Sequence, residues 1–211
     1  MTAEWASVLV GLLEVGAIVG LGLLGRHTFK KWREEKIFSR QAELAEHALA
    51  LTYQAIEVFN DVRNPWGHAG EGESRAGREA ELEEVRRIKD NLFTPIERLN
   101  SHSEYFKKVI DLRPSFMAVF GKDKCNPLDE ILKVRFEISH LAGLLLSRAE
   151  DDLHLRGQPR DEHSINLRKE FEELRWKGLA KEDAVDKRLN GAQVDMEKYV
   201  SPLLRSRFRV D

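Results

Sequence analysis

One pair of side chains in this chain has the residue types and spacing of a helical metal site. Glu137 and His140 lie three residues apart in the segment FEISH, so a helix would place both on one side. Di-iron bundles use two such pairs and two further glutamates, whereas the nearest second pair here is the Asp-x-x-His of Asp151 and His154. We therefore expect His140 to be a core or interface histidine, and we assign no metal ligand.

The single cysteine and a glycine-rich stretch are the other candidates for chemistry. Cys125 precedes an expected helix N-terminus, where the helix dipole lowers a thiol pKa, but no local motif supplies a histidine. The stretch GHAGEGESR, followed by Arg78, could cradle an anion, yet it lacks the Gly-Lys-Ser/Thr ending of a phosphate loop and contains two glutamates. We expect a plain connecting loop, and we identify no catalytic residue and no cofactor-binding residue.

An acidic residue, Glu14, stands inside the longest apolar run of the chain, from Trp5 to Gly25. About 20 apolar residues suffice to cross a membrane as a helix. No Lys or Arg precedes the run, which argues against a signal peptide, and a buried core helix rarely stays apolar all round for this length. One acidic residue opposes insertion by roughly 2.5 to 3.5 kcal/mol. About a dozen aliphatic residues each favour insertion by about 0.3 to 0.6 kcal/mol, and their sum is larger than that cost. The run predicts a transmembrane helix.

The flanks of this helix predict its orientation. Lys and Arg crowd its C-terminal side and are absent from its N-terminal side, so residues 1–4 should lie outside the cell. The bulk of the chain should lie in the cytoplasm, below the inner (plasma) membrane. The cations that form this positive-inside flank are Arg26, Lys30, Lys31 and Arg33.

Small residues predict that the transmembrane helix packs against another helix. A carboxylate in hydrocarbon needs a proton or a partner, so we expect the Glu14 face to meet a second copy of the chain or another membrane protein. A proton relay, or a Glu14 tolerated near the outer leaflet, are the alternatives. The Glu14 face is formed by Ser7, Gly11, Glu14, Gly22 and Gly25, and a second small-residue face by Gly16 and Gly20.

Helical periodicity continues through the rest of the chain, and no strand pattern occurs. Two adjacent apolar rows mark a helix over 29–62, and residues 63–77 read as a mobile loop. Pro95, between Thr94 and Glu97, indicates a kink or a restart within a helix over 82–110. The remaining predicted elements are a turn with a short helix over 112–121 and three helices, over 126–150, 164–177 and 182–204. We expect the helix over 126–150 to be the most buried, and the helix over 182–204 to be interrupted at 190–193.

These elements predict an all-α protein: one N-terminal transmembrane helix, then a cytoplasmic antiparallel helical bundle with shorter C-terminal helices. The expected domains are an outside tail (1–4), the span (5–25), the core bundle (26–158) and a C-terminal helical segment with a basic tail (159–211). The lone cysteine excludes an intramolecular disulfide and fits a reducing cytosol.

The function expected from this organisation is non-enzymatic: a membrane-anchored interaction, scaffold or sensor module. The alternatives are a membrane-active, toxin-like subunit that oligomerises through its span, and a metal-dependent bundle enzyme using Glu137 and His140. Expected partners are membrane lipid, a second copy or another membrane protein, and a cytoplasmic protein of unknown identity. With 34 basic and 36 acidic residues, the charge balance predicts no nucleic-acid partner.

Overall fold

The computed structural model describes the backbone of residues 2–154, 161–178 and 182–207, and their side chains except at 2–20, 23, 152–154 and 207. Every regular element in these ranges is helical, which confirms the all-α prediction. The α-helices are α1 (Thr2–Val62), α2 (Glu83–Ser101), α3 (Ser103–Phe120), α4 (Asn126–His154), α5 (Glu162–Arg175) and α6 (Ala184–Arg207). Two short 3-10 helices, η1 (Arg78–Ala80) and η2 (Lys122–Cys125), precede α2 and α4.

The chain divides into two units, Met1–Glu43 and Leu44–Asp211. In the first unit, the described side chains from Leu21 to Lys36 are all exposed, and Phe29 and Trp32 lie with their ring centroids 5.8 Å apart. Residues 5–20, most of the predicted span, have no described side chains. Among the residues that are described, no helix combines the length and the apolar character needed to cross a membrane.

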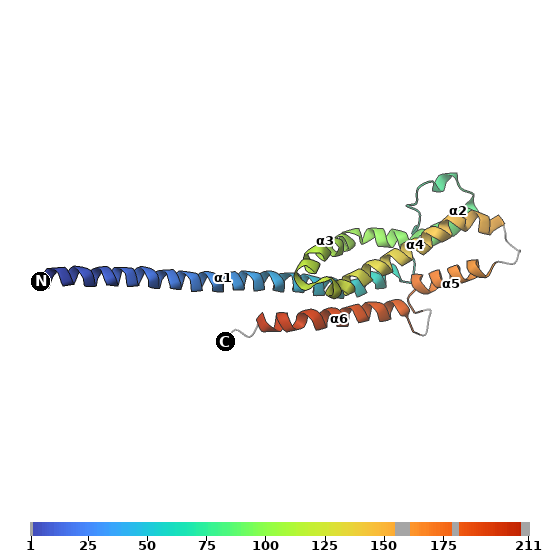
Figure 1. Cartoon of the computed structure of the whole chain (residues 1–211). Helices are drawn as coiled ribbons and strands as arrows, with labels where there is room; N and C mark the ends of the chain where they lie inside the picture. Colours follow the sequence, from blue (N-terminus) through green and yellow to red (C-terminus); the bar gives the residue numbers. More distant parts are fainter. Residues whose placement is uncertain (1, 155–160, 179–181, 208–211) are drawn as a thin grey trace. The chain divides into compact units, whose positions relative to one another are not determined.

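The second unit is an antiparallel bundle of the last turns of α1 with α2, α3, α4 and α6. Lys89 at the start of α2 pairs with Glu150 near the end of α4, whereas Arg113 of α3 pairs with Asp129 at the start of α4. Helix α4 therefore runs back along α2 and α3, as Figure 1 shows. Tyr53 of α1 donates to Glu197 of α6 (2.9 Å), and the two helices are also antiparallel.

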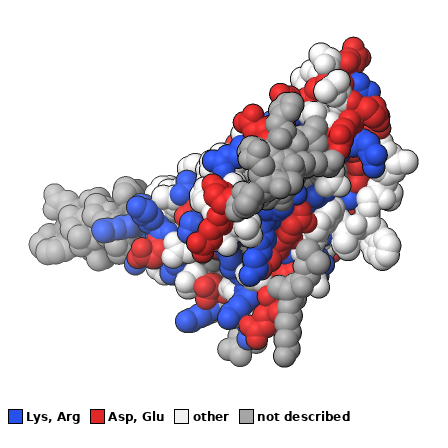
Figure 2. All heavy atoms as spheres, turned by 90° about the vertical axis from the view of Figure 1, so that its right-hand side faces the viewer, with Lys and Arg blue, Asp and Glu red and all other residues white. Residues whose placement is uncertain are grey.

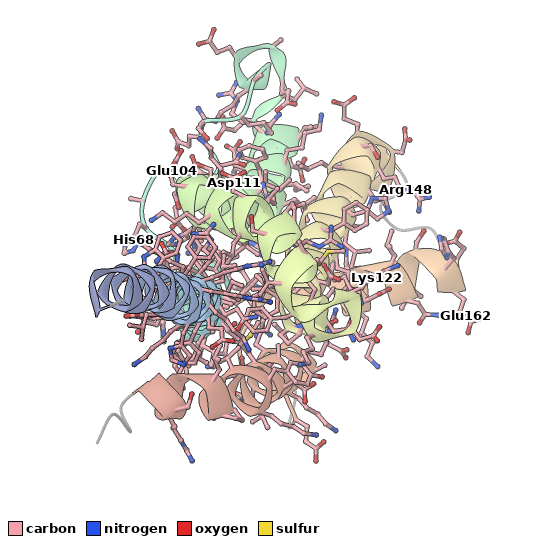
Figure 3. All side chains as sticks on the ribbon, turned by 60° about the vertical axis from the view of Figure 1, so that its left-hand side comes forward. His68, Glu104, Asp111, Lys122, Arg148 and Glu162 are labelled. Carbon is pink, nitrogen blue, oxygen red and sulfur yellow. The ribbon has the colours of Figure 1, made fainter. Side chains whose placement is uncertain are left out.

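Apolar rows of the sequence build the core of the bundle. Both rows predicted in α1 turn inward: Leu44, Ala48, Leu51 and Ala55 of the first row are buried, and so is Phe59 of the second. Helices α5 and α6 complete the same core. Most charged side chains lie at the surface, and those labelled in Figure 3 (Glu104, Asp111, Lys122, Arg148 and Glu162) are all exposed.

Several expected breaks are absent, because proline and glycine here lie inside continuous helices. Helix α1 passes Gly25 without a break, and α2 passes Pro95. The kink falls instead at His102, between α2 and α3. Pro114 lies within α3 where a turn was expected over 112–121, and α6 passes 190–193 without interruption. The N-cap of α5 is Asp161, whose carboxylate accepts from the Ser164 amide, so the helix predicted over 164–177 begins two residues earlier, at Glu162.

Candidate functional site

Buried arginines gather at the end of the bundle where α1 stops, α5 ends and α6 begins. Arginine is seldom fully buried unless it is paired. Arg63, Arg98 and Arg175 are nevertheless buried here, and each donates to at least one main-chain carbonyl in another part of the chain. None of the three was singled out from the sequence, and they make this end the most unusual part of the described structure.

Arg63 joins three helices. Its guanidinium donates to the main-chain oxygens of Leu174 (2.8 Å), Glu173 and Trp176 (3.3 Å each), which α5 leaves without helical partners. It also bonds Asp183 (2.8 Å), whose carboxylate accepts from the first amides of α6. Burial alone would raise the pKa of Asp183, but the bonds from Arg63 and from these amides outweigh it, and the pKa is lowered.

Arg98 shapes the segment that follows α1. It donates to the main-chain oxygens of Asn64 (2.6 Å), Val62 (3.3 Å) and Trp66 (3.1 Å). It also forms a fork with Glu71, at 2.7 and 3.0 Å, and these bonds lower the pKa of that carboxyl. One side chain thus caps α1 and determines the path of the chain over residues 64–71.

The rest of the segment is tied to α2 by ion pairs. Arg75 bonds Glu81 (2.7 Å) and Asp90 (3.2 Å), and Arg78 bonds Asp90 (2.9 Å). The bonds from Arg75, then those from Lys89, lower the pKa of Glu81 to about 2. Residues 63–77 were predicted to be a mobile connecting loop; instead, residues 63–82 form an anchored segment with partners along most of its length.

Arg175 is held differently, because Asn91 rather than a carboxylate receives its bonds. Its Nη1 donates to the Asn91 side-chain oxygen (2.8 Å) and its Nη2 to the Asn91 main-chain oxygen (2.6 Å). Pro95 lacks the amide that would otherwise bond this carbonyl in α2, so Arg175 fills a vacancy left by the proline. The guanidinium lies 3.9 Å from the centroid of the Trp176 ring.

A cavity of about 510 Å³ opens beside Arg175, between α2, the end of α5 and the 63–82 segment. We call it the Arg175 cavity. Trp176, His68 and Arg87 also line it. On the face of the molecule shown in Figure 2, basic and acidic side chains are interleaved over the described surface rather than separated by sign.

Glu137 and His140, which the sequence offered only as an alternative metal pair, do not form a metal site. Glu137 accepts from Arg188 of α6 (2.5 and 3.0 Å), and Glu130 accepts from the same guanidinium. His140 is exposed and stacks on Phe136, with ring centroids 5.3 Å apart. It is therefore not a core histidine, and the other half of the prediction, an interface histidine, stays a prediction. Phe136 itself, on the helix expected to be the most buried, is exposed too. Among the described residues, no group of three His, Cys, Asp or Glu side chains is placed to hold a metal ion.

The structure describes the side chains of only some of the other residues that the sequence analysis named. Cys125 is buried, and burial raises the pKa of its thiol, opposite to the activation that a helix N-terminus would give. Arg26, Lys30, Lys31 and Arg33 are exposed, and a Cβ at Gly22 or Gly25 would meet nothing within 4 Å. The remaining members of the two small-residue faces lie outside the described side chains: Ser7, Gly11, Glu14, Gly16 and Gly20.

Comparison of the chain with protein-family models, with curated proteins and with solved structures finds no match. Function therefore has to be inferred from the residues themselves. The bundle end offers guanidinium groups, an indole and a cavity, which are groups suited to binding an anion or a polar surface.

Proposed function

We propose that this protein is a single-pass, membrane-anchored helical module that binds other proteins and performs no reaction of its own. Residues 5–25 cross the inner (plasma) membrane, residues 1–4 lie outside, and the bundle lies in the cytoplasm. The observation that carries the proposal is the make-up of α1. One uninterrupted helix contains the apolar run, its cationic flank and the first core helix of the bundle.

The flank supports a membrane anchor through its side chains. Arg26, Lys30, Lys31 and Arg33 are exposed, and each cation near an anionic leaflet contributes about 1 kcal/mol to binding. Phe29 and Trp32 are exposed beside them, and Lys36 lies over the Trp32 ring at 5.9 Å. Indoles beside cations are favoured at the headgroup level of a membrane.

The surface of α4 supports the binding of a protein. Phe136 is 65% exposed, and with Leu132 it lines a shallow hollow of about 390 Å³. Charged side chains surround this apolar floor, including Arg113, Lys133 and Glu137. An apolar centre with a polar rim is the usual anatomy of a protein interface, and the occupant we propose is an apolar side chain of a cytoplasmic partner.

Membrane extraction tests the anchor. Full-length protein in isolated membranes should remain in the pellet after washing with alkaline carbonate, and a reporter active only in the cytoplasm should be active when fused after Asp211. Replacement of Leu12, Leu13 and Val15 by Asp should release the protein, because each central acidic residue costs roughly 2.5 to 3.5 kcal/mol. Release of the unaltered chain by carbonate would contradict the proposal.

A further inference from the structure

The charge of Arg175 is poorly neutralised for a buried group. An arginine offers five N–H donors, and the two bonds to Asn91 use two of them. The Nε of Arg175 is buried with no hydrogen-bond partner among the described residues. Its one ion pair in this part of the chain is with Glu172 at 3.7 Å, beyond hydrogen-bond distance. Burial disfavours the charged form and lowers the pKa of Arg175 to about 10, so the side chain still carries its charge at neutral pH.

The carboxylates that line the Arg175 cavity do not supply the missing countercharge, because each is paired with another cation. Glu71 pairs with Arg98 at 2.7 Å, and Asp90 pairs with Arg78 at 2.9 Å. Glu73 pairs with Arg78 as well, and Glu83 with Arg86 at 3.4 Å. The acidic lining is therefore neutralised from within the cluster of ion pairs.

A second cation of the cavity has no partner in the described chain. Arg87 of α2 lines the Arg175 cavity and also the adjoining hollow of about 390 Å³, and no ion pair or hydrogen bond joins it to a described residue. Asn91, which holds Arg175, lines the same two hollows. Arg87 and the Arg175–Asn91 pair thus lie at the boundary of one recess, on successive turns of α2 and at the end of α5.

We propose that the Arg175 cavity binds the oxyanion group, phosphate or carboxylate, of a small ligand, with Arg175 and Arg87 supplying the positive charge. Guanidinium groups donate parallel N–H bonds to such oxygens. The Trp176 ring, on which Arg175 stacks, fixes the orientation of this planar group. The volume of about 510 Å³ lies within the range of small-molecule sites. The bonds to Asn91 preorganise the arginine before a ligand arrives.

Indole resonances give a direct readout of this site. The chain has four tryptophans, and labelling the full-length protein in detergent with ¹⁵N-tryptophan gives one indole signal for each. Sodium phosphate, sodium acetate and sodium chloride are titrated separately at matched ionic strength. We expect phosphate or acetate to shift the Trp176 signal saturably, chloride to leave it in place, and the Trp5 and Trp32 signals to stay unchanged.

Two variants and a control locate the binding. Arg87→Gln removes an exposed side chain and should raise the midpoint concentration at least tenfold without altering the spectrum of the free protein. Arg175→Lys keeps the charge but loses the planar fork, and should weaken binding to a similar degree. Arg205→Gln removes one exposed positive charge from α6, outside the cavity lining, and should leave the midpoint unchanged.

The titration separates the sources of the oxyanion. Saturation by phosphate alone, by acetate alone or by both supports the site and names the group it prefers. No saturable shift with either salt would overturn the proposal, and so would equal midpoints for Arg87→Gln and Arg205→Gln. In those cases Arg175 would serve only to join α5 to α2.

Discussion

At the scale of single residues, this bundle depends on side chains that meet main-chain groups. Arg63 and Arg98 each bond three or more carbonyl oxygens at the ends of helices and in the segment after α1. Such carbonyls have no helical partner, and leaving one buried without a hydrogen bond costs about 1 to 3 kcal/mol. The two arginines thereby join the end of α1, the end of α5 and the start of α6 in one packed junction.

A pair of glycines in the anchored segment gives a test at this scale. Both have positive φ, +88° at Gly70 and +85° at Gly72, but a Cβ at Gly70 would meet nothing within 4 Å, whereas one at Gly72 would lie 2.0 Å from the Asp90 carbonyl oxygen. Gly70→Ala should cost about 1 kcal/mol for backbone strain alone. Gly72→Ala should cost about 3 kcal/mol or more, because the segment must also move off α2. Denaturant unfolding of the two variants checks this, and equal losses would show that the segment does not pack closely on α2.

At the scale of elements, the sequence predicted best where apolar residues recur without interruption. The rows of α1 agree with the structure, because burial alone determines their period. Helix α4 also begins at Asn126 as predicted. Pro95 was predicted to mark a kink or a restart but lies inside a continuous α2, because its effect depends on a distant residue: Arg175 bonds the Asn91 carbonyl that the proline leaves free.

The candidate site was hidden from the sequence for the same reason. Arg63 is joined to Leu174 across 111 positions, and Arg175 to Asn91 across 84, so no local spacing reports either contact. A lone arginine in a sequence reads as a solvated charge. The one available signal was position: Arg63 comes directly after the last buried residue of the α1 row, Val62.

The Pro95–Arg175 relationship predicts coupling between α2 and α5. In the parent chain, Arg175→Gln should cost about 2 kcal/mol, because bonds from a charged donor are lost. With Pro95→Ala already present, an amide at position 95 can bond the Asn91 carbonyl, and the cost of Arg175→Gln should fall by about 1 kcal/mol. A double-mutant cycle in denaturant unfolding measures this difference. Additive losses would mean that the arginine does not compensate for the proline.

At the scale of the whole molecule, the proposed anchor attaches the protein to the membrane and the bundle supplies the proposed binding sites. The anchor carries the side chains suited to lipid, and the bundle carries the apolar hollow at Phe136 and the Arg175 cavity. Both recesses lie in the unit Leu44–Asp211. Binding at either would therefore take place on the cytoplasmic side in the proposed topology, where soluble ligands and partners are present.

Assembly in the membrane is the last property that the proposed topology predicts. Because Cys125 is buried, single cysteines introduced into the span should dominate cross-linking in membranes. At about 100° per residue, Ser7 and Gly11 share the Glu14 face, whereas Val8 and Ala17 lie roughly 90° from the centre of that face, on opposite sides of the helix. We expect Ser7→Cys and Gly11→Cys to form disulfide-linked dimers on mild oxidation, and Val8→Cys and Ala17→Cys to stay monomeric. Cross-linking at Gly16→Cys and Gly20→Cys alone would transfer the contact to the second small-residue face. Uniform cross-linking at all six positions, or none, would show that neither face packs against a second copy.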